Sequence, residues 1–412
     1  MADVAARPYR APLGRFLLWL LPWFALLAFG ILGVVLCLWH GLNQTNMDNR
    51  FAFGLWIVLD LTVIALGAGA FFSGLLLYIL KRHELAPVIG GAVVLGFICY
   101  SSAVAVLGID VGQPLRSWFT FWHPNVHSML TEVTFCITCY LTVLAIEYVP
   151  LILKQRHLRR DPTLFVFQFQ IHKVMPVFAG IGAFLSMFHQ GSLGGLFGVL
   201  RGRPFAFREH FGIWPSTFFL FVLSAIATGP AFLALVTWTV SKLSRKELVK
   251  REVYDFLAQL SGGLLLFYVG WKAIDTLVWV NDTSPAAGFH AYHFYQQEPF
   301  GSWILFAEIV LGGLVPGLLF LWPRARKHMA VLIGAAVLAC IGVAINRYVM
   351  TIQTLALPTL SVDRFLSYRP SWQEVSVFGA MLSYGVIVYS LSHRYLPLYP
   401  QEQELLAAKR GA

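Results

Sequence analysis

Residues 89–108 read IGGAVVLGFICYSSAVAVLG, twenty residues in succession without a charged side chain. A helix rises 1.5 Å per residue, so this stretch is long enough to cross the roughly 30 Å hydrocarbon core of a bilayer. Nine other stretches have a similar length and character, so the pattern predicts an all-α polytopic membrane protein with ten transmembrane helices. The ten stretches run from Phe16 to His40, Gly54 to Leu80, Ile89 to Gly108, Val126 to Pro150, Phe165 to His189, Pro215 to Val240, Val253 to Val280, Ser302 to Trp322, Met329 to Met350 and Val375 to Leu391.

The composition of the whole chain agrees with burial in lipid. Of the 412 residues, 58% are apolar and only 12% are charged, and the mean hydropathy is +0.69. A soluble chain carries about 25% charged residues to cover its surface. No stretch outside the ten apolar ones is long enough for a soluble domain, so residues 1–412 are predicted to form a single integral membrane domain.

Positive charges alternate between the two sides of the predicted helices. Twenty of the 30 Lys and Arg residues lie in the termini and in the loops on their side, whereas seven lie in the opposite loops. The positive-inside rule therefore predicts that both termini are cytoplasmic. The same distribution accounts for the net charge of +10 without a nucleic-acid partner.

Ionisable and amide side chains inside the apolar stretches are the main indication of function. Each one costs free energy in hydrocarbon unless it is paired, hydrated or used. Four predicted helices bring such groups to a similar depth near the outer face: Asp60, Asp110, His127 with Glu132, and His189 with Gln190. This convergence predicts a polar pocket, although Asp110, His127 and His189 also suit helix caps or interfacial positions.

Further charged residues lie deeper or in the second half of the chain. Glu147 lies four turns beyond Glu132 on the same predicted helix, where it either snorkels to the interface or relays protons. The pair Cys136 and Cys139 lies within an apolar stretch and is interpreted as helix packing, so no metal site is predicted. The second half carries four charges that form either a structural ion-pair network or a transport path: Lys272, Asp275, Glu308 and Arg347.

Acids and histidines around an apolar pocket at one leaflet suit the chemistry of a quinone. Its reduction consumes two electrons and two protons, and the quinone oxygens need proton donors and acceptors within hydrogen-bond reach. The sequence shows no redox centre of its own, because nearly all twelve histidines lie in loops or at the ends of the predicted helices. We therefore expect the electrons to come from a partner subunit.

Four segments of the chain resemble the NrfD/PsrC family, the polysulfide-reductase-type integral membrane subunits of respiratory oxidoreductases. The likeness extends over nearly the whole chain. It is to the ten-span branch, which includes the membrane subunits of type-2 nickel-iron hydrogenase and of cytochrome c:menaquinone reductase complexes. The segments are Trp56-Ile57-Val58-Leu59-Asp60, Ile109-Asp110-Val111-Gly112, Asn125-Val126-His127-Ser128 with Glu132, and Met187-Phe188-His189-Gln190-Gly191-Ser192.

The resemblance implies a fold and a set of partners. The fold has two four-helix bundles, here residues 54–190 with the quinone site and residues 215–350, plus flanking helices. It implies a protein of the bacterial inner membrane without haem or metal, which works on menaquinone or another quinone near the periplasmic face. Electrons pass through a periplasmic iron-sulfur, ferredoxin-like subunit, to which a molybdopterin-family, hydrogenase or multihaem cytochrome c subunit is attached.

The resemblance also assigns roles to residues of this chain. Menaquinone reduction is the favoured reaction, and the protein is expected to be inactive without its partners. The catalytic residues would be Asp110, His127, Glu132 and His189, with Ser128, Gln190 and Trp56 completing the quinone site. Apart from the resemblance, the buried acids themselves suggest a proton path through Asp60, Glu132 and Glu147, and the outer water is the alternative proton source.

Two further features of the sequence bear on function. Arg201, Arg203 and Arg208 depart from the low positive charge of the outer loops, so they are predicted to dock the acidic surface of the partner or else to bind lipid phosphate. The buried acids also suit a transporter that moves an ion or a proton without redox chemistry.

We expect the purified chain to show no Soret band in its absorption spectrum. His127 and His189 are the only histidines that the predicted helices place to hold a haem between them. A stoichiometric b-type spectrum that disappears in His127→Ala or His189→Ala would contradict this expectation.

Overall fold

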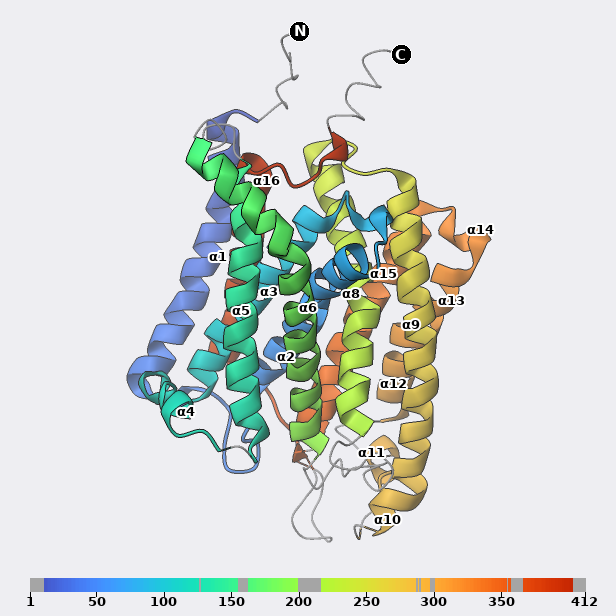
Figure 1. Cartoon of the computed structure of the whole chain (residues 1–412). Coiled ribbons are helices and arrows are strands. Elements are labelled where there is room, and N and C mark those ends of the chain that lie inside the picture. The colour runs from blue at the N-terminus through green and yellow to red at the C-terminus, as the bar shows by residue number, and fades with distance from the viewer. Residues whose placement is uncertain are drawn as a thin grey trace.

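The computed structural model describes residues 11–125, 127–154, 162–198, 216–286, 288, 290–296, 301–353, 355–356 and 366–402. Within these residues the chain is helical and has no strand, and ten helices are long and apolar enough to cross a membrane. This confirms the predicted all-α fold with ten spans. The two described ends of the chain meet at one end of the helices, where Arg394 Nη1 donates to the carbonyl oxygen of Ala11 at 2.9 Å. We call this the terminal end and the opposite one the distal end (Figure 1).

The first half of the chain contributes five long helices. In order they are α1 (Leu13–His40), α2 (Leu55–Gly74) with a π-helical continuation Leu75–Ile79, α3 (Ile89–Asp110), the short α4 (Phe119–Trp122), α5 (Met129–Leu153) and α6 (Pro162–Gly198). The helices α2, α3, α5 and α6 pack against one another. Their mutual packing encloses a core of buried apolar side chains between them.

The second half contributes five further spans. They are α8 (Ser216–Ser244), α9 (Arg251–Val278) with π-helical Trp279–Thr283, a span built from α12 (Ser302–Leu305), π-helical Phe306–Leu314 and α13 (Val315–Leu321), then α15 (Met329–Tyr348) with π-helical Val349–Gln353, and α16 (Trp372–Tyr395). Three short helices connect them: α10 (Ser284–Ala286), α11 (His293–Gln296) and α14 (Pro323–Arg326). Helix α16 pairs with α1 and also lies against α3, beside the other spans.

Small residues bring α2 and α8 into direct backbone contact. A Cβ atom built on Gly69 would lie 2.6 Å from the carbonyl oxygen of Gly229, closer than real Cβ contacts come. Ala68 and Ala225, on the same two helices, are fully buried. Small residues let membrane helices approach closely enough for backbone packing, which is a main source of association in lipid. This crossing joins the two halves of the chain.

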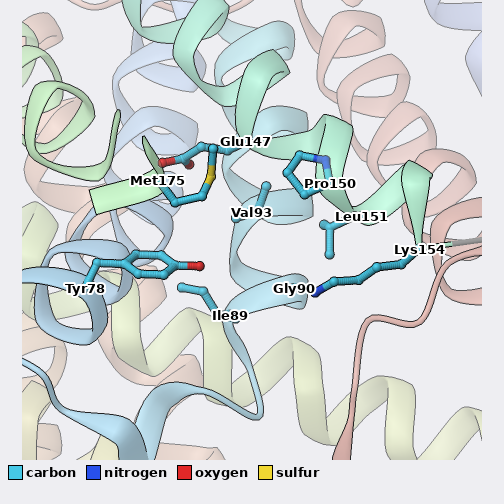
Figure 2. A pocket seen from close by; sticks show the side chains of 9 residues that line it. All are labelled: Tyr78, Ile89, Gly90, Val93, Glu147, Pro150, Leu151, Lys154 and Met175. Atoms are coloured by element: carbon cyan, nitrogen blue, oxygen red, sulfur yellow. The ribbon is translucent and has the colours of Figure 1, made fainter. Parts of the chain in front are cut away.

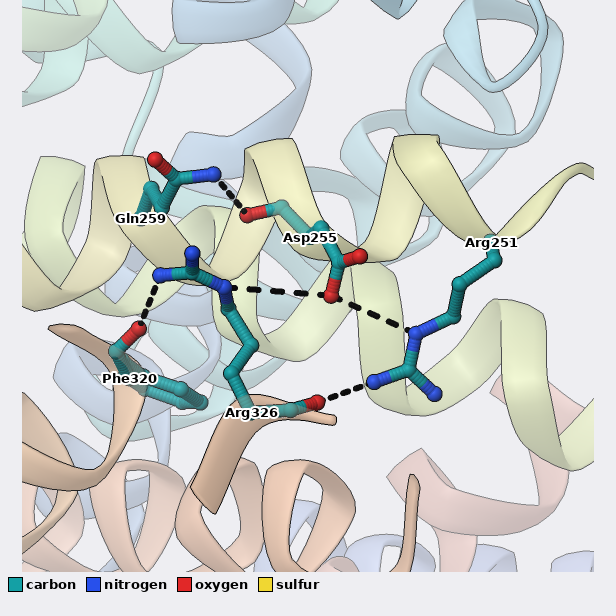
Figure 3. A network of polar contacts seen from close by, with 5 residues as sticks. All are labelled: Arg251, Asp255, Gln259, Phe320 and Arg326. Atoms are coloured by element: carbon teal, nitrogen blue, oxygen red, sulfur yellow. Dashed lines mark hydrogen bonds and ion pairs between the residues drawn. The ribbon is translucent and has the colours of Figure 1, made fainter. Parts of the chain in front are cut away.

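Charged residues at the terminal end tie α9 to the span before α15. Figure 3 shows Asp255 between two guanidinium groups, with its Oδ1 atom 3.3 Å from Arg251 Nε and 3.9 Å from Arg326 Nε. Arg326 Nη1 also donates to the carbonyl oxygen of Phe320 at 2.9 Å. These contacts satisfy carbonyl groups where α13 ends and fix the turn into α14.

We expect Gly229→Ala to destabilise the protein more than Gly263→Ala. The added methyl group at Gly229 meets the backbone of α2, and overpacking of this kind costs about 1–3 kcal/mol. A Cβ atom at Gly263 meets nothing within 4 Å, so that variant serves as the matched control. Thermal unfolding of the two variants in detergent measures the difference, and equal melting temperatures would show that the close crossing does not contribute to stability.

Candidate functional site

Helix α6 carries the histidine and amide of the predicted site in its interior. The sequence predicted that this span ends at His189, but α6 continues to Gly198. The loop predicted to follow His189 includes Gly191 and Gly194. In the structure they lie within the helix, where a Cβ atom on Gly194 would come within 2.8 Å of the ring of Phe221 on α8. Their small size therefore serves close helix packing rather than a turn.

His189 is fully buried among neighbours from three helices. Its ring centroid lies 6.1 Å from that of Tyr100 on α3, and the backbone of Val133 on α5 lies close to it. Neither ring nitrogen makes a hydrogen bond of good geometry with the described part of the chain. Buried polar atoms of this kind normally have a partner, so the imidazole is available to a ligand or to water.

Glu132 lies in the first turn of α5 and is held by α6. The Ser192 hydroxyl donates a hydrogen bond of 2.6 Å to Glu132 Oε2. Ser192 is fully buried, whereas Glu132 is partly exposed. Ser192 lies three residues after His189, which is almost one helical turn. The structure thus brings Glu132 and His189 to neighbouring levels of the same helix pair, α5 and α6.

Tyr100 is a central residue of this region that sequence reasoning missed. It is fully buried, its hydroxyl group is hydrogen-bonded to that of Ser186, and its ring lies edge-on to Tyr140 with 4.4 Å between centroids. Gln190 also lies against its hydroxyl group. The available signal was a lone tyrosine in the uncharged stretch 89–108, where a buried phenol needs a hydrogen-bond partner.

Asp60 and Asp110 form a second polar group on α2 and α3. Asp60 is 1% exposed, and Asp110 is close enough for the two carboxylates to repel each other. One oxygen of each carboxyl group, Oδ1, has no hydrogen-bond partner in the described residues. Trp56 lies one turn before Asp60, is fully buried, and packs with Val106 and Ile109 of α3. These three predicted residues therefore meet at the distal end of α2 and α3.

Glu374 on α16 is the second residue that sequence reasoning missed. Its carboxylate accepts hydrogen bonds from the backbone nitrogens of Asn46 at 3.0 Å, Leu55 at 3.3 Å and Ser371 at 2.9 Å, and from the Tyr368 hydroxyl. It is fully buried, and its charge also acts on Asp110. The capping box Ser371-x-x-Glu374 was the sequence signal for the start of α16, but not for the contact with α2.

His127 and Ser128 lie apart from the buried groups. His127 is exposed in the turn before α5, where its backbone nitrogen donates to Asn125 Oδ1 at 3.0 Å. Ser128 is partly exposed and makes no side-chain cap to the helix. No contact in the described residues joins either of them to His189. The predicted docking residues lie outside the described residues: Arg201, Arg203 and Arg208.

Glu147 lines a cavity of about 50 Å³ at the terminal end. Figure 2 shows it together with Tyr78 from the π-helical continuation of α2, Met175 from within α6, and Lys154 directly after α5. A cavity of this size has room for water, and Tyr78, Glu147 and Lys154 offer polar partners among mostly apolar walls. The threonines between Glu132 and Glu147 do not line a path, since the hydroxyl groups of Thr134, Thr138 and Thr142 bond to carbonyl oxygens of their own helix.

Three of the four charges of the second half are linked in one buried network. Lys272 Nζ lies 3.3 Å from Glu308 Oε1, and Asn346 donates to the same oxygen at 2.7 Å. Arg347 donates to Asn346 at 2.7 Å and to the Ser224 hydroxyl at 2.9 Å. Asp275, one turn after Lys272, is fully buried beside them in sequence. Charges of opposite sign thus pair between α9 and the Phe306–Leu314 segment, and Asn346 links them to Arg347 on α15.

Two cysteines lie on α5, and one of them, Cys136, is one turn after Glu132. Cys136 is partly exposed and Cys139 exposed, and no group of three potential metal ligands occurs within the described ranges. The polar arrangement is therefore one of carboxyl, imidazole, phenol and hydroxyl groups. Such groups donate and accept protons, and they do so here in a largely apolar surrounding at the distal end of α2, α3, α5 and α6.

Comparisons with known proteins identify the family of the chain. The chain is 49% identical over 397 residues to the integral membrane subunit of menaquinone reductase from Nitratidesulfovibrio vulgaris, covering 96% of this chain and 95% of that protein. It is 24% identical to the probable Ni/Fe-hydrogenase 2 b-type cytochrome subunit of Escherichia coli, over 87% and 86% of the two chains. It is 22% identical to a selenate reductase subunit of Mesobacillus selenatarsenatis, over 93% and 95%. The family model of polysulphide reductase, NrfD, matches residues 43–358, and the chain therefore belongs to the NrfD family.

Proposed function

We propose that this protein is the quinone-reactive membrane subunit of a respiratory oxidoreductase complex and that it reduces menaquinone. The observation that carries the proposal is the 49% identity, along almost the full length of both chains, to a protein named as a menaquinone reductase membrane subunit. Relatives named as hydrogenase and selenate reductase subunits support a role within a redox complex. The protein works in the bacterial inner membrane, where a quinone diffuses within the bilayer.

Buried polar atoms without partners support a substrate site at the distal end. Asp60 Oδ1, Asp110 Oδ1 and both ring nitrogens of His189 lack hydrogen bonds to the described residues. A polar group that is taken out of water without a hydrogen bond costs free energy, so such groups need a ligand or water. A quinone carries two carbonyl oxygens and accepts hydrogen bonds from protonated carboxyl or imidazole groups. The residues present thus fit the head group.

The site residues hold and supply protons in this proposal. When bound, the quinone takes up two electrons and two protons. Glu132, oriented by the Ser192 hydroxyl, and His189 hold protons on the α5 and α6 side, whereas Asp110 holds one at Oδ1 on the α3 side. Trp56 and Gln190 are proposed to border the head group. His127 and Ser128 stand at the exposed entrance before α5.

Proton supply from the terminal end is the second part of the proposal. Glu147 and Glu132 are 15 residues apart on α5, or roughly 22 Å, so protons need intermediate groups. Tyr140 lies between them on the buried face and contacts Tyr100, which neighbours His189. We propose that water in the cavity at Glu147 supplies protons to Tyr140 and Tyr100. Asp60 would belong to the proton path on the other side of the site.

Electrons come from partner subunits. We propose a periplasmic iron-sulfur, ferredoxin-like subunit, with a molybdopterin-family, hydrogenase or multihaem cytochrome c subunit attached to it. The site near the distal end then faces the periplasm, and the bundle at residues 54–190 contains it. The name of the Escherichia coli relative includes a b-type cytochrome, so the absorption spectrum of the purified chain tests whether the electrons need a haem here.

We expect Glu132→Gln to reduce the rate of menaquinone reduction by the native complex by about 10²–10⁴-fold, the usual effect of a lost general acid. Binding of a menaquinone analogue should change little, because glutamine keeps the shape and can still bond to Ser192. The matched control is Glu84→Gln, an exposed acid at the terminal end that pairs with Arg82. Full turnover in Glu132→Gln would exclude Glu132 as the proton donor. An unmodified complex that binds no quinone analogue would instead refute the function and favour an ion transporter.

Replacing the three arginines of the outer loop tests the docking surface. Changing Arg201, Arg203 and Arg208 together to glutamine should release the electron-carrying subunit at physiological salt, because an acidic partner surface would lose its counter-charges. Co-purification measures the association. Unchanged association at physiological and at high salt would disprove the docking role. The control replaces three exposed cations of the terminal end by glutamine: Lys242, Lys250 and Arg324.

A further inference from the structure

The connection between α3 and α5 contains a short helical segment at the distal end, residues 113–123, which we call the α4 segment. A 3₁₀ turn at Pro114–Arg116 leads into α4. The backbone bonds continue through both, from Ser117 to the carbonyl of Pro114 at 3.2 Å and from His123 to that of Phe119 at 2.8 Å. The α4 segment is therefore a helical stretch of about three turns rather than an irregular loop.

Two different faces run along the α4 segment. The apolar residues recur at i, i+3, i+4 and i+7, the spacing of one side of a helix. They are also unusually exposed for their size: Leu115 by 88%, Trp118 by 52%, Phe119 by 44% and Trp122 by 73%. The polar residues have the same spacing, shifted by two positions: Gln113, Arg116, Ser117 and Thr120. The α4 segment is thus amphipathic, and nothing in the described chain covers its apolar side.

The surroundings of the α4 segment are lipid-facing surfaces of the spans. The ring of Phe121 packs edge-on against that of Phe135 with 5.0 Å between centroids, and Phe135 belongs to the exposed face of α5. Trp39, near the distal end of α1, is 82% exposed. Figure 1 shows α4 at this end of the molecule, and Gly112, just before the segment, lies against Leu42, two residues after the end of α1. The exposed apolar surface is therefore continuous from the spans to the α4 segment.

We propose that the α4 segment is an interfacial helix that lies in the lipid leaflet at the distal end, with its tryptophans between head groups and acyl chains. Tryptophan is enriched at this depth, and amphipathic helices lie there with their apolar side in the acyl layer. An apolar surface of this kind is rarely left to water. Continuity with the lipid-facing sides of α1 and α5 favours lipid over a partner protein as the cover.

The position of the α4 segment has a consequence for substrate access, which rests on the proposed function. It directly follows Asp110 at the end of α3 and precedes His127 and Glu132 at the start of α5. A lipid-soluble quinone that approaches from the bilayer meets this helix beside the site. The apolar side of the segment then supports its long isoprenoid tail while the head group reaches the acids.

Spin labels at single cysteines test the membrane position. The complex is reconstituted in liposomes on a background of Cys136→Ala, Cys139→Ala and Cys340→Ala, and power saturation is measured with oxygen and with a water-soluble nickel chelate. Labels at Leu115→Cys and Trp122→Cys should collide with oxygen and be shielded from nickel. Labels at Gln113→Cys and Thr120→Cys should show the reverse, as the matched controls. Equal exposure to nickel at all four positions would overturn the proposal, and so would shielding of the first two from both agents, which indicates a protein cover.

Enzyme kinetics test the link to the substrate. Replacing Leu115, Trp118 and Trp122 by serine should raise the KM for long-tailed menaquinone several-fold, with an unchanged kcat. The KM for a short-tailed, water-soluble analogue should stay the same. An equal change for both substrates would refute the role in access. If the complex reduced neither quinone, the proposed function would fail while the spin-label result still decided the position of the helix.

Discussion

Polar groups inside this bundle must find partners within the protein, because hydrocarbon offers none. The two halves of the chain meet this constraint differently. In the second half, a chain of contacts runs from Lys272 through Glu308 and Asn346 to Arg347, whose guanidinium group also stacks on Phe221 at 3.7 Å. In the first half, Asp60, Asp110 and His189 keep polar atoms without hydrogen bonds to the described residues. In the second half, buried charges of opposite sign pair with one another, although Arg347 Nε has no hydrogen bond there. The first half retains carboxyl and imidazole groups that a ligand can satisfy.

The two regions are also connected by packing. Phe221 lies on α8 between the guanidinium group of Arg347 and the backbone of Gly194 on α6. Gly194 follows Ser192, which orients Glu132. The buried charges of the second half therefore help to fix the helix that carries His189. Glu374 has a comparable effect from α16, because it binds the first backbone nitrogen of α2 and sets the position of Trp56 and Asp60. Burial and the Glu374 carboxylate raise the pKa of Tyr368, which keeps this phenol protonated as a donor.

Hydrophobic length was enough to predict the spans, because lipid imposes one strong requirement on every helix. It was also enough to single out Asp60, Glu132 and His189 as buried or helix-bound polar residues. Tyr100 and Glu374 were not predicted as site residues. Their importance depends on contacts with residues far away in sequence, Ser186 for Tyr100 and the start of α2 for Glu374. The extension of α6 was missed for a different reason. Glycine marks a turn and a close helix contact alike, and only the presence of α8 beside Gly191 and Gly194 distinguishes them.

The glycine contact between α2 and α8 limits how the two halves can move. Many transporters rock one bundle against the other to expose a central site to each side in turn. Here the backbones of Gly69 and Gly229 are in direct contact, with no side chain between them. Sliding of one helix along the other would drive neighbouring Cβ atoms into the opposite backbone, so this contact resists relative motion of the two halves. A mechanism that rocks one half against the other would first have to separate this backbone contact.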